Sequence, residues 1–156
     1  MYSVLYVDDE PVLLELGKTF LEMSGSLSVE TALSAADAIE LLKTHAVDCI
    51  ISDYQMPEMD GIAFLKYIRL HLDSLPFILF TGRGREEVVI AAFSNSADFY
   101  LQKGGDPTAQ FVELKHNVKL AIERRWTQDE LKESRQRLSD IINHLPDATL
   151  AIDLNH

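Results

Sequence analysis

Hydrophobic residues along the chain follow two alternating patterns. Short apolar runs are typical of buried strands, and they cover residues 3–7, 47–52, 76–80 and 97–101, while residues 27–33 have β character through Val29 and Thr31. Between and after these runs, apolar residues recur at helical spacing, which predicts helices over residues 11–23, 34–42, 60–72, 86–94 and 108–125. In the first helix the recurring positions are Leu13, Leu16, Phe20 and Met23. In the last helix one face carries Phe111, Leu114, Val118 and Ile122. The pattern therefore predicts a strand followed by a helix, repeated five times.

Residues at the predicted helix starts support this division. Pro11 lies where a proline is tolerated, because the first helical N–H needs no partner. Ser34 can cap the second helix, and Asp37 follows it by three residues as a variant of the capping box. Asp60 and Gly61 open the third helix.

Strands that alternate with helices, through connections too long for hairpins, indicate crossover units and a parallel sheet. Five such units predict an α/β fold, a doubly wound five-stranded parallel sheet with helices on both faces. In this fold class, ligands bind beyond the carboxyl ends of the strands. The residues that follow each predicted strand are therefore the candidate site.

The residues after 125 form a C-terminal helical extension of different character. Residues 126–142 are charged and helical, with Leu131, Leu138 and Leu145 spaced by seven. Two heptads do not establish a coiled coil, so a solvated linker helix and a short dimerising or signal-transmitting helix both stay open. Residues 149–154 resemble a strand, and a lone strand is not stable. We expect a domain at 1–125, a linker helix at 126–145 and the truncated start of another domain at 146–156.

The composition narrows the class of protein. Apolar residues are 47% and charged residues 25% of the 156, which is ordinary for a soluble globular protein. A net charge of −11 argues against direct binding to nucleic acid. No apolar run approaches the roughly 20 residues of a membrane span, and no signal peptide is visible. Cys49 is the single cysteine, which excludes an internal disulfide and agrees with a cytoplasmic location.

Acidic, hydroxyl and basic side chains follow the predicted strands. Asp8 and Asp9 follow the first strand, Asp53 the third, Thr81 the fourth and Lys103 the fifth. In the predicted sheet these residues meet at one edge. Two like charges about 4 Å apart repel by roughly 4 kcal/mol at an effective dielectric constant of about 20, so three carboxylates favour a bound cation. Lys103 supplies one charge, and the remainder indicates a divalent ion that prefers oxygen ligands, such as Mg²⁺.

Asp53 is the candidate nucleophile, because it stands alone at the end of its strand. A carboxylate beside Mg²⁺ can attack phosphorus and form an aspartyl phosphate. This transfer requires in-line positioning and neutralisation of the phosphoryl oxygens. Mg²⁺ and Lys103 can supply the positive charge, and the Thr81 hydroxyl can donate a hydrogen bond.

Four separate motifs together resemble a response-regulator receiver domain of the CheY-like family. They are Val7–Pro11, Asp53–Gly61, Thr81-Gly82 and Asp98–Lys103, and the resemblance covers about residues 1–125. It implies the flavodoxin-like strand order 2-1-3-4-5. It also implies that Asp53 is the phosphoacceptor and that Lys103 contacts the phosphoryl group. Mg²⁺ would be held by Asp8 or Asp9, by Asp53 and by the main-chain carbonyl of Gln55. Thr81 and Tyr100 would form the switch pair.

The same resemblance implies partners. The expected donor is a phosphohistidine on a sensor histidine kinase or a phosphotransfer protein. Phosphorylation is expected to switch the surface formed by the helix over 86–94, the strand over 97–101 and the helix over 108–125, and to signal to a downstream domain of the same chain. That surface and the linker helix are the two candidate faces for a homodimer. Residues 145–154 are similar to the opening of a PAS sensory domain.

One position departs from the family pattern. Gly104 and Gly105 follow Lys103, where the family usually has a proline, and the nearest proline is displaced to Pro107. Glycine can adopt the required backbone conformation but does not lock it. A receiver-like docking module that accepts no phosphate is therefore an alternative to the phospho-accepting domain.

A Mg²⁺-dependent phosphatase of the haloacid-dehalogenase type is a weaker alternative. That class needs a second aspartate two residues after the nucleophile, whereas Gln55 follows Asp53 and Glu10 follows Asp8 at that spacing. We therefore expect a signalling domain and not an enzyme, apart from its own phosphorylation and dephosphorylation.

Overall fold

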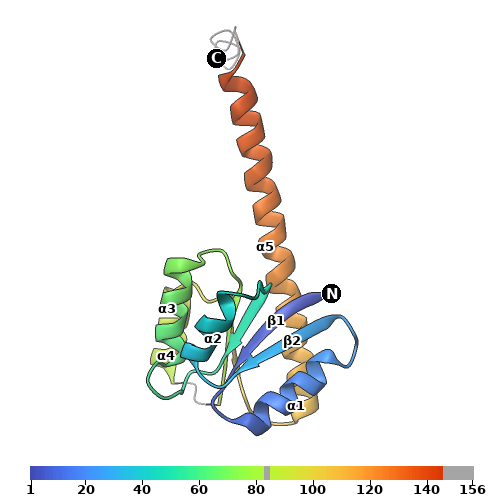
Figure 1. Ribbon diagram of the computed structural model, residues 1–156, viewed down its shortest axis with the longest axis vertical. Helices are drawn as coiled ribbons and strands as arrows, with labels where there is room; N and C mark the ends of the chain where they lie inside the picture. The colour runs from blue at the N-terminus through green and yellow to red at the C-terminus, as the bar shows by residue number, and fades with distance from the viewer. Residues whose placement is uncertain (83–84, 146–156) are drawn as a thin grey trace. The chain divides into compact units, whose positions relative to one another are not determined.

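A computed structural model describes residues 1–82 and 85–145 of the chain (Figure 1). The strands in this part are β1 (Tyr2–Val7), β2 (Leu27–Ala32), β3 (Cys49–Ser52), β4 (Phe77–Thr81) and β5 (Phe99–Gln102). The helices are α1 (Pro11–Glu22), α2 (Ala35–Leu42), α3 (Gly61–His71), α4 (Glu86–Ser94) and α5 (Pro107–Asn143). The chain divides into two compact units, Met1–Ile122 and Glu123–His156.

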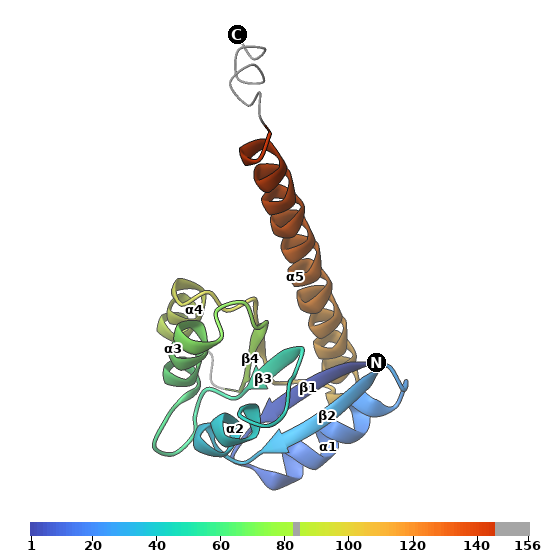
Figure 2. The same ribbon diagram turned by 45° about the horizontal axis from the view of Figure 1, so that its top comes forward.

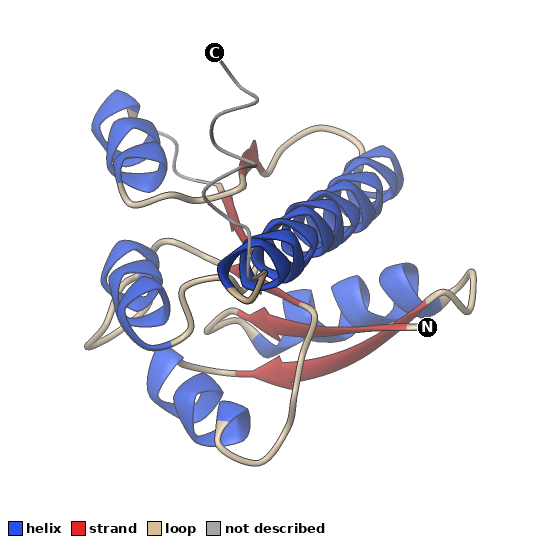
Figure 3. Cartoon of the chain, turned by 90° about the horizontal axis from the view of Figure 1, so that it is seen from above, coloured by secondary structure: helices blue, strands red, loops and turns tan. Residues whose placement is uncertain are grey.

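The five strands form one parallel sheet in the order β2-β1-β3-β4-β5. Figure 2 shows β2, β1, β3 and β4 side by side in this order. Helices lie on both sides of the strands, as Figure 3 shows. The structure thus confirms the predicted doubly wound fold and its strand order.

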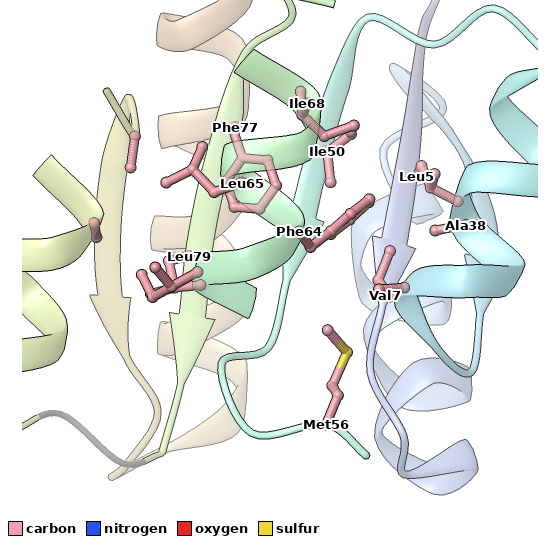
Figure 4. Close-up of a cluster of buried hydrophobic side chains, with 14 of the residues drawn as sticks. Leu5, Val7, Ala38, Ile50, Met56, Phe64, Leu65, Ile68, Phe77 and Leu79 are labelled. Atoms are coloured by element: carbon pink, nitrogen blue, oxygen red, sulfur yellow. The ribbon is translucent and has the colours of Figure 1, made fainter. Parts of the chain in front are cut away.

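Alternate residues of the strands supply two separate cores. Leu5, Val7, Ile50 and Leu79 pack against α2, α3 and α4, in the cluster drawn in Figure 4. Their neighbours along the strands pack against α1 and the first part of α5, and include Val4, Tyr6, Ile51, Ile78 and Phe80. Because successive side chains of a strand point to opposite faces, continuous apolar runs are what a sheet covered on both sides requires.

The helices begin where the polar residues indicate. Pro11 is the first residue of α1. The Ser34 hydroxyl accepts a hydrogen bond from the Asp37 N–H at 3.1 Å, and the Asp60 carboxylate accepts one from the Ala63 N–H at 2.8 Å. Both side chains satisfy N–H groups that have no partner within the helix.

The apolar positions that recur along α1 do not all lie on its buried face. Leu14, Gly17 and Leu21 are the buried residues of this helix, whereas Leu16 is 37% exposed and Met23 is 74% exposed. Consecutive apolar residues from Val12 to Leu14 are compatible with more than one helical face. The true face is the one on which Gly17 lets the helix approach the Tyr6 ring.

α5 continues without interruption from Pro107 to Asn143, across the predicted boundary at residue 125. Its buried residues are Phe111, Leu114, Val118, Ala121 and Ile122, which include the four predicted ones. In the second unit, Leu131, Leu138 and Leu145 are exposed. The boundaries at 125 and 145 stay predictions, and the expected start of a further domain at 146–156 lies outside the described residues.

Within residues 1–82 and 85–145, no helix has the length and apolar character needed to cross a bilayer.

Candidate functional site

Backbone hydrogen bonds bring the carboxyl ends of the strands together. The Asp8 N–H donates to the Ala32 carbonyl at 3.1 Å, and the Asp53 N–H donates to the Val7 carbonyl at 2.9 Å. On the other side of the sheet, the Lys103 N–H donates to the Thr81 carbonyl at 2.8 Å. The residues that directly follow the strands are therefore held in register, as the parallel sheet predicts.

A buried ion pair lies at the centre of this edge. The Lys103 ammonium lies 2.7 Å from Asp8 Oδ2 and 3.7 Å from Asp53 Oδ1. Asp8 is completely buried, and Asp53 is 7% exposed. The ammonium also lies 5.4 Å from the centre of the Phe80 ring, within range of a cation–π interaction. One cation thus faces two buried carboxylates.

The surroundings of the Asp53 carboxyl disfavour its charged form. Burial raises its pKa above the ordinary value, and the nearby Asp8 raises it further. The Lys103 ammonium and hydrogen bonds from the Thr81 side chain and the Tyr54 N–H act in the opposite direction without reversing the shift. The raised pKa therefore reflects chiefly the cost of burying the charged carboxylate, which the lysine and the hydrogen bonds do not fully offset.

A pocket of about 610 Å³ opens onto these groups. Its lining includes Asp9, Asp53, Gln55, Thr81 and Lys103. Gly82 also lines the pocket and adds no side chain there. Asp53 is therefore buried among polar groups and still accessible to a small reactant.

The described donor groups fit a magnesium ion. Carboxylate oxygens of Asp8, Asp9 and Glu10 lie within 4.8 Å of one another, and Asp53 and Gln55 line the pocket beside Asp9. Among the residues that line this pocket, neither histidine nor cysteine occurs. Oxygen donors and excess negative charge suit Mg²⁺ rather than zinc. Glu10 is not among the predicted ligands, although its place directly after Asp8 and Asp9 in the sequence points to it.

The loop after β3 is fixed from both ends. Met56 is 6% exposed and belongs to the core cluster of Figure 4. The Gly61 N–H donates to the Tyr54 carbonyl at 2.7 Å. A Cβ atom on Gly61 would clash with the main-chain carbonyl of Asp53, so only glycine lets α3 start this close to the nucleophile. These contacts place Asp53 and Gln55 on the pocket.

Tyr100 is placed differently from the other predicted site residues. It lies in β5 and packs against the core cluster that includes Leu79, Val88 and Ala92. Its hydroxyl is buried and has no hydrogen-bond partner among the residues described, and burial raises its pKa. The structure therefore brings together Asp8, Asp9, Asp53, Gln55, Thr81 and Lys103, and places Tyr100 outside the pocket lining.

Sequence comparisons match this chain to signalling proteins. Residues 4–115 match the family model of the response regulator receiver domain. Response regulator Rre1 of Synechocystis is 32% identical over 145 residues, which are 92% of this chain and 61% of Rre1. The transcriptional regulatory protein SrrA of Staphylococcus aureus is 31% identical over 140 residues, 90% of this chain and 55% of SrrA. The chain thus spans little more than half the length of these relatives.

Comparison with solved structures gives the same family. A response regulator receiver domain protein from Clostridium thermocellum superposes with a TM-score of 0.72 at 25% identity, covering 82% of this chain and 99% of that one. TrrA from Thermotoga maritima, solved in complex with Mg²⁺ and BeF, gives a TM-score of 0.68 at 29% identity, with coverage of 78% and 99%.

Proposed function

Because the chain belongs to the response regulator receiver domain family, we propose that it accepts a phosphoryl group on Asp53 and so acts as the input switch of a two-component signalling protein. The observation that carries this proposal is the position of the Asp53 carboxylate. It is buried beside one ammonium and opens into a pocket lined by hydroxyl, carboxylate and ammonium groups.

The chemical step is a displacement at phosphorus. A carboxylate oxygen of Asp53 attacks the phosphorus of a phosphohistidine, an O–P bond forms, and the N–P bond breaks. The electron pair of that bond leaves with the imidazole nitrogen, which takes up a proton from solvent. Lys103 neutralises charge on the transferring oxygens, and the Thr81 hydroxyl donates a hydrogen bond to them. Gly82 leaves the approach open.

The residues proposed to hold magnesium are Asp8, Asp9 and Asp53, with the main-chain carbonyl of Gln55. Bound there, the ion would neutralise negative charge on the phosphoryl oxygens and on the crowded carboxylates. The chain's own part is to keep these oxygens together. Asp8 is fixed by Lys103 at 2.7 Å and by the Glu10 N–H at 3.0 Å, and Asp53 by the Tyr54 N–H at 2.8 Å.

Phosphorylation is proposed to shift a conformational equilibrium through Thr81 and Tyr100. The phosphoryl group adds negative charge and three acceptor oxygens, which favour a state with the Thr81 hydroxyl drawn toward them. Tyr100 can then turn into the space vacated. Its buried hydroxyl, unpaired in the described structure, supports this role, because a rotamer that reaches a partner removes an energetic penalty. The surface of α4, β5 and α5 would change as a result.

The partners follow from the same proposal. The phosphoryl donor is a sensor histidine kinase or a phosphotransfer protein. The signal then passes through α5 to a downstream domain of the same chain. We also propose a cytoplasmic location, and a homodimer through the α4-β5-α5 surface or through the exposed leucines of residues 126–145. The domain at 1–125 and the PAS-like start at 146–156 remain part of this proposal.

The test is intact-mass measurement after incubation with acetyl phosphate and Mg²⁺. We expect one phosphoryl adduct on the parent chain and none on Asp53→Asn. Asp73→Asn is the matched control, because it makes the same change at an exposed residue. An adduct on folded Asp53→Asn contradicts the assignment of Asp53 as the acceptor. No adduct on the folded parent favours a docking module that accepts no phosphate. Steady release of phosphate from simple esters would instead favour a phosphatase.

A further inference from the structure

The turn between β5 and α5 does not fix its own backbone. It directly follows Lys103 and contains Gly104, with φ of +153°, and Gly105, with φ of +74°. Residues with a side chain rarely adopt these backbone conformations, whereas glycine adopts them at no steric cost. A Cβ atom added to either glycine would have no neighbour within 4 Å, so no packing surrounds the two positions where a side chain would project. The Lys103 N–H is bonded to the Thr81 carbonyl at 2.8 Å, and restraint of the chain after Lys103 has to come from a further group.

The Gln110 side chain bonds to the backbone on both sides of Lys103. Its Oε1 accepts a hydrogen bond from the Gly104 N–H at 3.0 Å, and its Nε2 donates to the Gln102 carbonyl at 2.6 Å. A primary amide is suited to this task, because it carries one acceptor and one donor at adjacent positions. The two bonds close a bridge across the lysine.

Gln110 is itself anchored in the first turn of α5. Its N–H donates to the Asp106 carbonyl at 3.1 Å, and the Asp106 carboxylate accepts the Thr108 N–H at 3.2 Å. The next residue, Phe111, is 5% exposed and packs in the core with Phe80. The amide therefore extends from a fixed point to the turn.

We propose that Gln110 is a positioning residue for phosphoryl transfer. Its amide fixes the main chain on both sides of Lys103, so that the ammonium stays directed at Asp8 and Asp53. It supplies by hydrogen bonds the restraint that the two glycines lack. Gln110 does not line the Asp53 pocket, so it acts only through Lys103. This inference rests on the proposed phosphorylation of Asp53.

The first measurement is hydrogen exchange of the Gly104 amide, followed by NMR in the unphosphorylated chain. Gln110→Ala is expected to accelerate this exchange about tenfold, since the amide loses its acceptor. Gln136→Ala is the matched control, because it makes the same substitution in the same helix and removes only an exposed bond to Asp140. Equal exchange in the parent and in Gln110→Ala overturns the bridge.

The second measurement is the rate of adduct formation with acetyl phosphate and Mg²⁺. Gln110→Ala is expected to slow it about tenfold, because small displacements of an oriented group are costly to the rate. Gln136→Ala should react like the parent. In a Lys103→Ala chain, adding Gln110→Ala should cause no further loss, because no ammonium remains to be positioned. A further tenfold loss there shows a general structural role and overturns the inference.

The outcomes separate the two proposals. If the parent forms no adduct on Asp53, the proposed function fails, and the positioning role fails with it, even where Gly104 exchange shows that the bridge exists. If the parent and Gln110→Ala form the adduct at the same rate, phosphorylation stands and the positioning role is wrong.

Discussion

Asp53 carries its negative charge where the folded chain disfavours it. Its pKa is raised above the ordinary 3.8, chiefly by burial, so the folded state binds a proton more tightly than the unfolded state. Stability is therefore lost as the pH rises through the folded pKa. We expect Asp53→Asn to raise the free energy of unfolding at neutral pH without Mg²⁺, and the gain to shrink as the pH falls toward 3.8. Urea unfolding across this range measures it.

Magnesium provides the complementary test of this residue. A cation bound only by the folded state stabilises that state, so Mg²⁺ should raise the melting temperature of the parent more than that of Asp53→Asn. Asp73→Asn should respond to Mg²⁺ like the parent. In the urea experiment without Mg²⁺, a difference in free energy of unfolding between the parent and Asp53→Asn that does not change with pH would show that charge is not the cause.

Arg69 stabilises the end of the sheet opposite the site. Its guanidinium donates to the Ser96 carbonyl at 2.8 Å, the Leu75 carbonyl at 2.6 Å and Asp98 Oδ2 at 3.1 Å. Arg69 and Asp98 are only 13% and 14% exposed. Arg69→Ala should lower the free energy of unfolding by about 3 kcal/mol, because it leaves a nearly buried carboxylate without its cation, with the Phe77 N–H as a remaining donor. Lys43→Ala, which breaks the exposed pair with Glu40, should leave the urea midpoint nearly unchanged.

The residue types at the site could be predicted, but their mutual placement only in part. Asp53, Thr81 and Lys103 follow strands, and a parallel sheet brings strand ends together whatever the details of packing. Gln110 is different, because its role depends on the shape of a turn with two positive φ angles. Tyr100 was predicted from the family resemblance, and only the structure shows that its side chain is partly buried against the core cluster.

At the scale of elements, two helical glycines allow close packing on opposite faces of the sheet. A Cβ atom on Gly61 would meet the main chain of Asp53, and one on Gly17 would meet the ring of Tyr6. Alanine at either position should lower the free energy of unfolding by about 1–3 kcal/mol through overpacking. Only Gly61→Ala should also slow adduct formation by folded protein, because it displaces the nucleophile. Equal rates for the two variants would count against this account of the loop.

The limits of the apolar pattern are visible in α1. Three consecutive apolar residues, Val12 to Leu14, satisfy more than one helical face, and the choice depends on which face has room for the sheet. Gly17 provides that room against Tyr6. In the first part of α5 the apolar spacing is unambiguous, and Phe111, Leu114, Val118 and Ile122 are buried as predicted.

At the scale of the whole molecule, the core uses α5 only as far as Ile122. The leucines of the second unit, Leu131, Leu138 and Leu145, are exposed. A fragment of residues 1–125 is therefore expected to unfold cooperatively with nearly the free energy of the full chain, and to acquire the same single adduct. Urea unfolding and intact mass measure both. Loss of cooperative unfolding in the fragment would show that residues after 125 are needed for folding.

The ion pair between Lys103 and Asp8 joins residues 95 positions apart in the chain. Such a contact contributes heavily to contact order, and its formation requires that the entropy of closing a long loop be overcome. During synthesis, a nascent chain that has not yet emerged past β5 holds its first aspartates without the ammonium that balances them. The reactive centre is thus assembled only after the chain has emerged past Lys103, and a shorter nascent chain holds Asp8 without its ion-pair partner.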